Sequence, residues 1–325
     1  MTLPAFFDYR DQQLWCENVE LTSICERYGT PTYVYSKAAI SHAMQSYINA
    51  LGDHPGLICY AVKANSNLAV LQLLARLSAG FDIVSGGELA RVLAAGGRPD
   101  RIVFSGVAKT ALELETALKA GIHCFNIESV AEIKRLSEIA QTLGLIAPVS
   151  IRVNPDVDAR THPYISTGLA DNKFGVSMEQ AYHAYQLAHA SPNLEIIGID
   201  CHIGSQLTEL APFQDALERV LALVDRLAAD GISLRHVDAG GGLGVRYQNE
   251  QIPGIEDYVS ALKGPLAQRG LALFLEPGRS IVANAGVLLM QVDALKVTET
   301  RHFALVDAAM NDMLRPALYQ AWMDI

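Results

Sequence analysis

Leu57-Ile58-Cys59-Tyr60-Ala61-Val62 is an apolar run that ends on Lys63 and lies between Gly56 and Asn65. A short apolar run between turn-forming residues is typical of a strand whose two faces are both buried. Residues 67–79, which follow, repeat apolar side chains at helical spacing. A lysine beside such a strand is costly to bury unless it has a partner or a function. This stretch therefore predicts a β/α unit with a lysine at the carboxyl end of its strand.

The same alternation of short apolar runs and amphipathic segments continues along the chain. We predict strands over residues 57–62, 81–84, 102–105, 124–127, 149–153, 196–201, 234–239 and 271–276. Helices are predicted over residues 67–79, 111–120, 129–143, 177–190 and 212–229. Eight β/α units are the number that closes a (β/α)8 TIM barrel, the α/β fold that we predict. A doubly wound open sheet is the alternative, although no G-x-G-x-x-G pattern opens a helix after the first strand.

Two flanking regions do not fit the barrel. Residues 32–35 are strand-like before the first unit, and residues 287–295 and 303–306 look like β segments with no helix between them. We therefore predict a barrel over residues 36–277, and part of a second β domain over residues 1–35 and 278–325.

Composition excludes several classes of protein. The net charge of −10, without a run of Lys or Arg, argues against binding to nucleic acid or to an anionic membrane. Five cysteines without C-x-x-C spacing argue against a disulfide framework or a zinc site, so we expect reduced thiols and no metal. No signal peptide and no apolar stretch of membrane-spanning length is found, which predicts a cytoplasmic protein.

Polar residues gather at the carboxyl ends of the predicted strands, where barrel enzymes build their active sites. The glycine run Gly240-Gly241-Gly242 follows the seventh strand, and Glu276-Pro277-Gly278-Arg279 follows the eighth. Barrels often bind phosphate with these two loops, and consecutive glycines let backbone N–H groups converge on it. A glycine-rich turn can also be only a turn. Its position here favours a phosphate site facing Lys63.

The predicted strand ends carry several candidate site residues, and for Glu276 and His202 a structural interpretation stands beside the functional one. Glu276 could simply pair with Arg279, or could keep the ring nitrogen of a pyridoxal cofactor protonated. His202 could be structural, or could stack on a cofactor ring while Ser205 donates to its phosphate. Desolvation would lower the pKa of Lys63 and free its amine for Schiff-base chemistry. Asp82 ends the second strand and Arg152 the fifth.

Five motifs, in this order, resemble the alanine-racemase-type pyridoxal enzymes, and more narrowly the ornithine/diaminopimelate/arginine decarboxylase group. They are Tyr60-Ala61-Val62-Lys63-Ala64-Asn65, Phe81-Asp82-Ile83-Val84-Ser85-Gly86-Gly87-Glu88, His202-Ile203-Gly204-Ser205, Gly240-Gly241-Gly242 and Glu276-Pro277-Gly278-Arg279. A finer resemblance, to the diaminopimelate decarboxylases, is carried by Arg152-Val153-Asn154-Pro155-Asp156-Val157, Thr161-His162-Pro163-Tyr164-Ile165-Ser166-Thr167-Gly168, Asn172-Lys173-Phe174-Gly175 and Met310-Asn311-Asp312-Met313-Leu314-Arg315-Pro316-Ala317-Leu318-Tyr319.

The resemblance implies that pyridoxal 5'-phosphate is the cofactor and that meso-diaminopimelate is decarboxylated to L-lysine, the last step of lysine biosynthesis. By resemblance, Lys63 forms the Schiff base, His202 stacks on the ring and Glu276 pairs with the pyridine nitrogen. The residues implied to hold the phosphate or surround the cofactor are Ser205, Gly240, Gly241, Gly242, Gly278, Asp82, Arg152 and Arg279. Those implied to bind the substrate carboxylate that does not react are Arg279, Arg315 and Tyr319.

Alternatives remain at this stage. An ornithine or arginine decarboxylase would need an acid for the distal cation of its substrate, and Arg315 with Tyr319 argues against it. A racemase and a noncatalytic pyridoxal-phosphate barrel are disfavoured by the decarboxylase-like run near the end and by the onset of a β domain. The resemblance also implies a homodimer with shared active sites. Family members continue into a β domain with a catalytic cysteine, so we expect this chain, ending at Ile325, to be incomplete and inactive alone.

Overall fold

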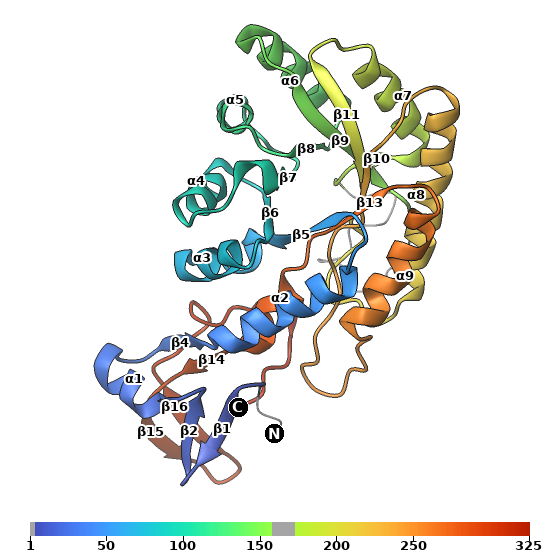
Figure 1. The fold of residues 1–325 in the computed structure, drawn as a ribbon. Coiled ribbons are helices and arrows are strands. Elements are labelled where there is room, and N and C mark those ends of the chain that lie inside the picture. The colour runs from blue at the N-terminus through green and yellow to red at the C-terminus, as the bar shows by residue number, and fades with distance from the viewer. Residues whose placement is uncertain (1–3, 158–172) are drawn as a thin grey trace.

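The computed structural model describes residues 4–157 and 173–325. Its centre is a closed barrel of eight parallel strands (Figure 1). The barrel strands are β5 (Gly56–Ala61), β6 (Gly80–Ile83), β7 (Ile102–Phe104), β8 (Cys124–Ile127), β9 (Ala147–Asn154), β11 (Leu194–Asp200), β12 (His236–Asp238) and β13 (Ala272–Leu275). The short β10 (Val176–Ser177) adds to the end of β9. Pairing of β8 with β9 and of β13 with β5 completes the ring, so the predicted barrel is confirmed and the open sheet is wrong.

Helices cover the outside of the barrel (Figure 1). They are α2 (Lys37–Leu51), α3 (Leu68–Arg76), α4 (Gly86–Ala94), α5 (Ala111–Ala120), α6 (Val130–Leu143), α7 (Met178–His189), α8 (Ala211–Ala229) and α9 (Ile255–Ala267). Ser85, Thr110, Ser129 and Ser177 begin four of them by accepting a backbone N–H bond. All five predicted helices are present. The sequence analysis missed α2, α4 and α9, of which α4 starts on two glycines and α9 contains Pro265.

Strand residues alternate between two apolar layers. On β5, Leu57 and Cys59 belong to a cluster with Val103 and Phe274, whereas Ile58 and Tyr60 belong to the large core. Successive side chains of a strand point to opposite faces, and here both faces are covered, by the barrel interior on one side and by helices on the other. This arrangement explains why the strands read as continuous apolar runs.

The two flanks of the barrel meet in an accessory β region (Figure 1). Before the barrel lie β1 (Phe7–Arg10), β2 (Gln13–Cys16), β3 (Val19–Glu20), α1 (Leu21–Tyr28) and β4 (Thr32–Tyr35). After it lie α10 (Arg279–Val282), β14 (Gly286–Leu289), β15 (Val292–Val297), β16 (His302–Val306) and α11 (Arg315–Tyr319). Antiparallel pairing of β4 with β14 places Val34 opposite Val287. The segment 287–295, predicted as one β segment, is two strands, because the chain leaves β4 at Leu289 and then pairs with β16.

Three further observations bear on the sequence predictions. All five cysteines are free. Within the described residues, no helix is both long enough and apolar enough to cross a membrane. The motif at 161–168 and Asn172 lie outside the described residues, whereas Lys173, Phe174 and Gly175 lie within them.

Candidate active site

Lys63 follows β5 and points to Asp82 on β6, with 2.5 Å between Nζ and Oδ2. The Asp82 side chain is fully buried, whereas half of the Lys63 side chain remains exposed. Burial acts to lower the pKa of Lys63, but Asp82 and Glu276 outweigh it and raise the pKa to about 12. The expectation that desolvation lowers the pKa of Lys63 is therefore wrong, because the sequence did not show that Asp82 and Glu276 lie close enough to outweigh burial.

Three buried carboxyl groups lie together: Asp200 and Asp238 end β11 and β12, Glu276 directly follows β13, and their oxygens lie within 4.8 Å of one another. Glu276 Oε1 accepts from Ser105 Oγ at 3.3 Å and from Asn126 Nδ2 at 3.4 Å. Burial raises the pKa of Glu276 well above its ordinary value, and Asp238 adds to the effect. Burial likewise raises the pKa of Asp238, to about 7. Such a cluster favours a proton or a cation at its centre.

Arg152, near the end of β9, is held by protein carboxylates. Its Nη1 donates to Glu128 Oε1 at 3.0 Å, and its Nε lies 3.7 Å from Asp200 Oδ2. Glu128 also accepts from the backbone N–H groups of Gly106 and Gly175. The Arg152 guanidinium is therefore fixed beside the carboxylate cluster. Burial keeps the pKa of His202 well below its ordinary value, and the positive charges of Arg152 and Lys63 add to this effect.

The glycine loop after β12 lies against the loops after β11 and β13. A side chain at Gly241 would place its Cβ 2.2 Å from the Glu276 carbonyl oxygen, and one at Gly242 would come 2.4 Å from the Gly204 carbonyl oxygen. Gly240 and Gly242 also have φ of +67° and +115°, which L side chains rarely adopt. Gly241 N donates to His202 Nδ1 at 3.2 Å, which fixes the imidazole against this loop.

Beyond the glycine loop, Arg279 links the predicted site residue Ser205 to Tyr247, which was not predicted. Its Nε and Nη2 donate to Ser205 Oγ at 3.3 and 3.1 Å, and its Nη1 donates to the Tyr247 hydroxyl at 2.7 Å. Arg315 lies over the rings of Tyr247 and Tyr319, 5.1 and 5.8 Å from their centroids. The structural interpretation of Glu276, an ion pair with Arg279, is wrong, because the described residues show no such ion pair.

These residues fit pyridoxal 5'-phosphate at both of its polar ends. Asp200 Oδ1 and Asp238 Oδ2 are buried and, among the described residues, accept no hydrogen bond, so the cluster around Glu276 can receive a protonated ring nitrogen. At the other end, the Ser205 hydroxyl lies beside the glycine loop, where Gly240 N and Gly241 N donate to Asp238 Oδ1 and His202 Nδ1, so the Ser205 hydroxyl and the Gly242 N–H are the donors that a phosphate could use. Lys63 lies in the same set of strand ends.

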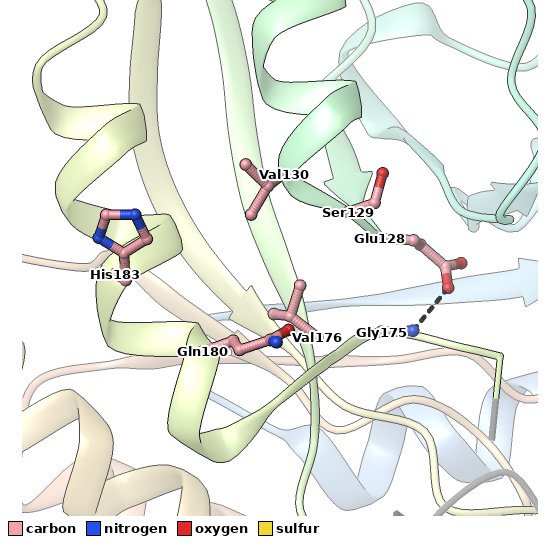
Figure 2. Close-up of a pocket in the computed structure, with 7 residues that line it drawn as sticks. All are labelled: Glu128, Ser129, Val130, Gly175, Val176, Gln180 and His183. Atoms are coloured by element: carbon pink, nitrogen blue, oxygen red, sulfur yellow. Dashed lines mark hydrogen bonds between the residues drawn. The ribbon is translucent and has the colours of Figure 1, made fainter. Parts of the chain in front are cut away.

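A hollow of about 460 Å³ lies beside this site, at the carboxyl ends of β8 and β9 (Figure 2). It is lined by Glu128, Ser129, Val130, Gly175, Val176, Gln180 and His183. Glu128 Oε1 accepts from Arg152, and Glu128 Oε2 accepts from Gly175 N at 3.0 Å at the edge of the hollow; Figure 2 shows the second of these bonds. Because Glu128 is already engaged by Arg152 and two backbone groups, we assign the hollow no ligand.

The sequence analysis missed four residues that shape this site: Glu128, Asp200, Asp238 and Tyr247. Asp200 and Asp238 end two barrel strands, as Glu276 follows a third, so their position was a usable signal. Glu128 directly follows β8 and offered the same signal. Tyr247 lies in the loop after the glycines and carried none.

Comparison with known proteins agrees with this geometry. The family model for the pyridoxal-dependent decarboxylase, pyridoxal binding domain, matches residues 37–283. Diaminopimelate decarboxylase of Pseudomonas aeruginosa is 62% identical over 98% of this chain and 77% of the relative. The structure of diaminopimelate decarboxylase from Helicobacter pylori complexed with L-lysine matches with a TM-score of 0.91 and 47% identity, over 94% of this chain and 77% of that one.

A more distant structure matches equally well in shape. Diaminopimelate decarboxylase from M. jannaschii in complex with L-lysine gives a TM-score of 0.93 at 38% identity, covering 99% of this chain and 78% of that one. Fold, site geometry and sequence similarity therefore agree, and the chain belongs to the pyridoxal-dependent decarboxylases and, within them, to the diaminopimelate decarboxylase family.

Proposed function

We propose that the protein decarboxylates meso-diaminopimelate to L-lysine and carbon dioxide with pyridoxal 5'-phosphate as cofactor. The observation that carries this proposal is the pair Arg279 and Arg315, two guanidinium groups on either side of Tyr247 without a carboxylate partner in the described residues. A substrate whose non-reacting end bears a carboxylate supplies that partner. Ornithine and arginine carry a cation at that end, which the two arginines would repel.

Each predicted residue has a defined task in this proposal. Lys63 would hold the cofactor through its side-chain amine. Asp82, at 2.5 Å, accepts a hydrogen bond from the lysine and holds it at the strand end. The bound cofactor supplies an electron sink for the pair of electrons left when carbon dioxide departs. The substrate is oriented by Arg279, Arg315 and Tyr319.

The residues around the ring tune it and hold it in place. Glu276, supported by Ser105 and Asn126, keeps the ring nitrogen protonated. His202 stays neutral, because burial lowers its pKa, and can therefore lie flat against the ring without adding positive charge. Ser205, Gly240, Gly241, Gly242 and Gly278 hold the phosphate, and Arg152 adds positive charge beside the carboxylates.

A chemical labelling experiment tests the cofactor assignment. Reduction of the purified holoprotein with borohydride should fix the pyridoxyl group on Lys63, and peptide mass spectrometry reads the position. Lys63→Ala should lose the visible absorbance band and lower turnover by about 10³-fold or more, because the covalent attachment is gone. An adduct on another lysine in the wild-type protein would contradict the assignment.

A substrate comparison tests the activity itself. The wild-type protein should release carbon dioxide from meso-diaminopimelate and not from ornithine or arginine. Decarboxylation of ornithine instead would favour the alternative decarboxylase, and cofactor binding without any turnover would favour a noncatalytic barrel.

The organisation of the protein is part of the same proposal. We place the barrel at residues 36–277 and assign residues 1–35 and 278–325 to a β domain, supported by the β4–β14 pairing. By family resemblance the protein is a cytoplasmic homodimer with shared active sites. Sedimentation of the holoprotein at twice the mass of one chain would support the dimer, and a single-chain mass would contradict it.

A further inference from the structure

Tyr247 contacts both Arg279 and Arg315, neither of which has a carboxylate partner in the described part of the chain. Its hydroxyl accepts from Arg279 Nη1 at 2.7 Å, and its ring lies 5.1 Å from the guanidinium carbon of Arg315. The guanidinium carbon of Arg279 is 5.9 Å from the centroid of the same ring. One half-buried side chain thus contacts both cations, through a hydrogen bond on one side and through the face of its ring on the other.

The loop that carries Tyr247 is fixed from three directions. Gln206 bonds both backbone groups of Val245, with Nε2 donating to the carbonyl at 2.6 Å and Oε1 accepting from the N–H at 3.1 Å. Glu250 Oε2 accepts from the N–H groups of Tyr247 and Gln248 at 3.0 and 2.7 Å. Asn284 donates to the Arg246 carbonyl at 3.3 Å. A tyrosine on such a loop is preorganised, so it can fix the position of its neighbours.

The charges around Tyr247 explain why the two arginines need such a group. Burial lowers the pKa of the Arg315 guanidinium, and the like charge of Arg279 adds to that effect while Tyr247 opposes it. The buried Nε of Arg315 has no hydrogen-bond partner among the described residues. Three donors of Arg279 are directed by Ser205 and Tyr247. The Tyr247 hydroxyl therefore fixes the orientation of the Arg279 guanidinium, and the Tyr247 ring supports the Arg315 guanidinium.

We propose that Tyr247 is a positioning residue that holds Arg279 and Arg315 in the arrangement that receives the carboxylate at the non-reacting end of the substrate. The inference rests on the proposed function and adds a specificity-determining residue to it. Tyr247 acts through the arginines. Its loss should therefore weaken binding of molecules that carry this carboxylate and leave the decarboxylation step itself unchanged.

The test separates binding from chemistry in the full-length holoprotein. Tyr247→Phe keeps the ring and removes the hydroxyl, so KM for meso-diaminopimelate should rise about 10-fold, with kcat within about two-fold, as expected for one lost bond to a charged group. Tyr247→Leu removes the ring as well and should raise KM by about 100-fold. The absorbance spectrum of the bound cofactor should not change in either variant.

A matched control is available on the outer helices. The Tyr182 hydroxyl also bonds a charged group, Asp230, and an arginine, Arg226, lies over its ring, far along the chain from the site. Tyr182→Phe should leave KM and kcat unchanged. Inhibition adds a second readout: Tyr247→Phe should weaken competitive inhibition by L-lysine as much as it raises KM, and should leave inhibition by cadaverine, which has no carboxylate, unaltered.

Two results would overturn the inference while the proposed function stands. One is wild-type KM in an active Tyr247→Phe protein. The other is an equal weakening of inhibition by L-lysine and by cadaverine in Tyr247→Phe, which would indicate general damage to the site. Failure of the wild-type protein to form lysine from meso-diaminopimelate would instead overturn the proposed function, and this inference with it.

Discussion

His236 and Asp238 are the first and last residues of β12, and burial shifts their pKa values in opposite directions. Burial lowers the pKa of His236 to about 3, and it raises the pKa of Asp238 to about 7. In both cases the neutral form is favoured. His236 stacks on Phe274 with ring centroids 4.3 Å apart, whereas Asp238 lies among carboxyl groups within reach of Arg152 and Lys63. Only the Asp238 end therefore offers groups that a charged ligand can meet.

Glycine serves a different purpose at each end. At the amino-terminal end, a Cβ on Gly198 would lie 2.2 Å from the His236 ring, so this glycine makes room for a protein side chain. At the carboxyl-terminal end, Gly240, Gly241 and Gly242 let the loop after β12 pack closely against the loops after β11 and β13, and Gly241 N donates to His202 Nδ1. One end of β12 is therefore packed against the protein's own side chains, whereas the other end carries buried polar groups that a charged ligand can meet.

The largest effect is expected at the carboxyl-terminal end. Glu276→Gln should keep the cofactor but lower kcat by about 10²-fold, because a neutral amide cannot hold the ring nitrogen protonated. The free energy of unfolding should not fall, since the change removes a buried group whose pKa is raised by burial. Steady-state kinetics and urea unfolding measure the two quantities. Near-normal turnover of Glu276→Gln would contradict the proposal that the carboxyl-terminal end of the barrel strands, and not the amino-terminal end, holds the cofactor ring.

The opposite pattern is expected for His236→Phe. In the wild-type protein the unfolded chain binds a proton at His236 below about pH 6.5 and the folded protein does not until about pH 3, so stability rises with pH across this window. At pH 4 the free energy of unfolding of the variant, measured by urea denaturation, should exceed that of the wild-type protein by about 3 kcal/mol. Its kcat at pH 7 should be unchanged. An unchanged pH dependence of unfolding would mean that His236 is not kept neutral.

The smallest effect is expected for Asp238→Asn, measured in the cofactor-free protein. There the folded protein keeps a proton at Asp238 up to about pH 7 while the unfolded chain has lost it above about pH 4, so stability falls as pH rises. In the variant, the decrease in the free energy of unfolding with rising pH should be smaller by about 1–2 kcal/mol. The difference is this small because Asp200 and Glu276 contribute to the same pH dependence. Identical unfolding curves at pH 5 and pH 7.5 in wild-type protein would contradict it.

The barrel was predictable because its strands are buried on both faces and stand out as apolar runs between helices. Lys63, Glu276 and the glycine loop were found because each follows such a run, at the edge where barrel sites lie. The pKa of Lys63 was not predictable, since its direction depends on Asp82 and Glu276, which lie on other strands. Tyr247 was missed because its importance comes from Arg279 and Arg315, which are distant in sequence and meet it only in the fold.

The pairing of β4 with β14 also constrains the time course of synthesis. Val34 and Val287 are partners although about 250 residues separate them, and the whole barrel lies between them in the chain. At a translation rate of ~5–20 residues per second, β4 leaves the ribosome tens of seconds before its partner exists. During that interval its backbone N–H and C=O groups form an open strand edge, the kind of surface to which chaperones and other nascent chains bind. The accessory β region is thus the last part of the described fold that can be completed, whatever the order in which the barrel strands assemble.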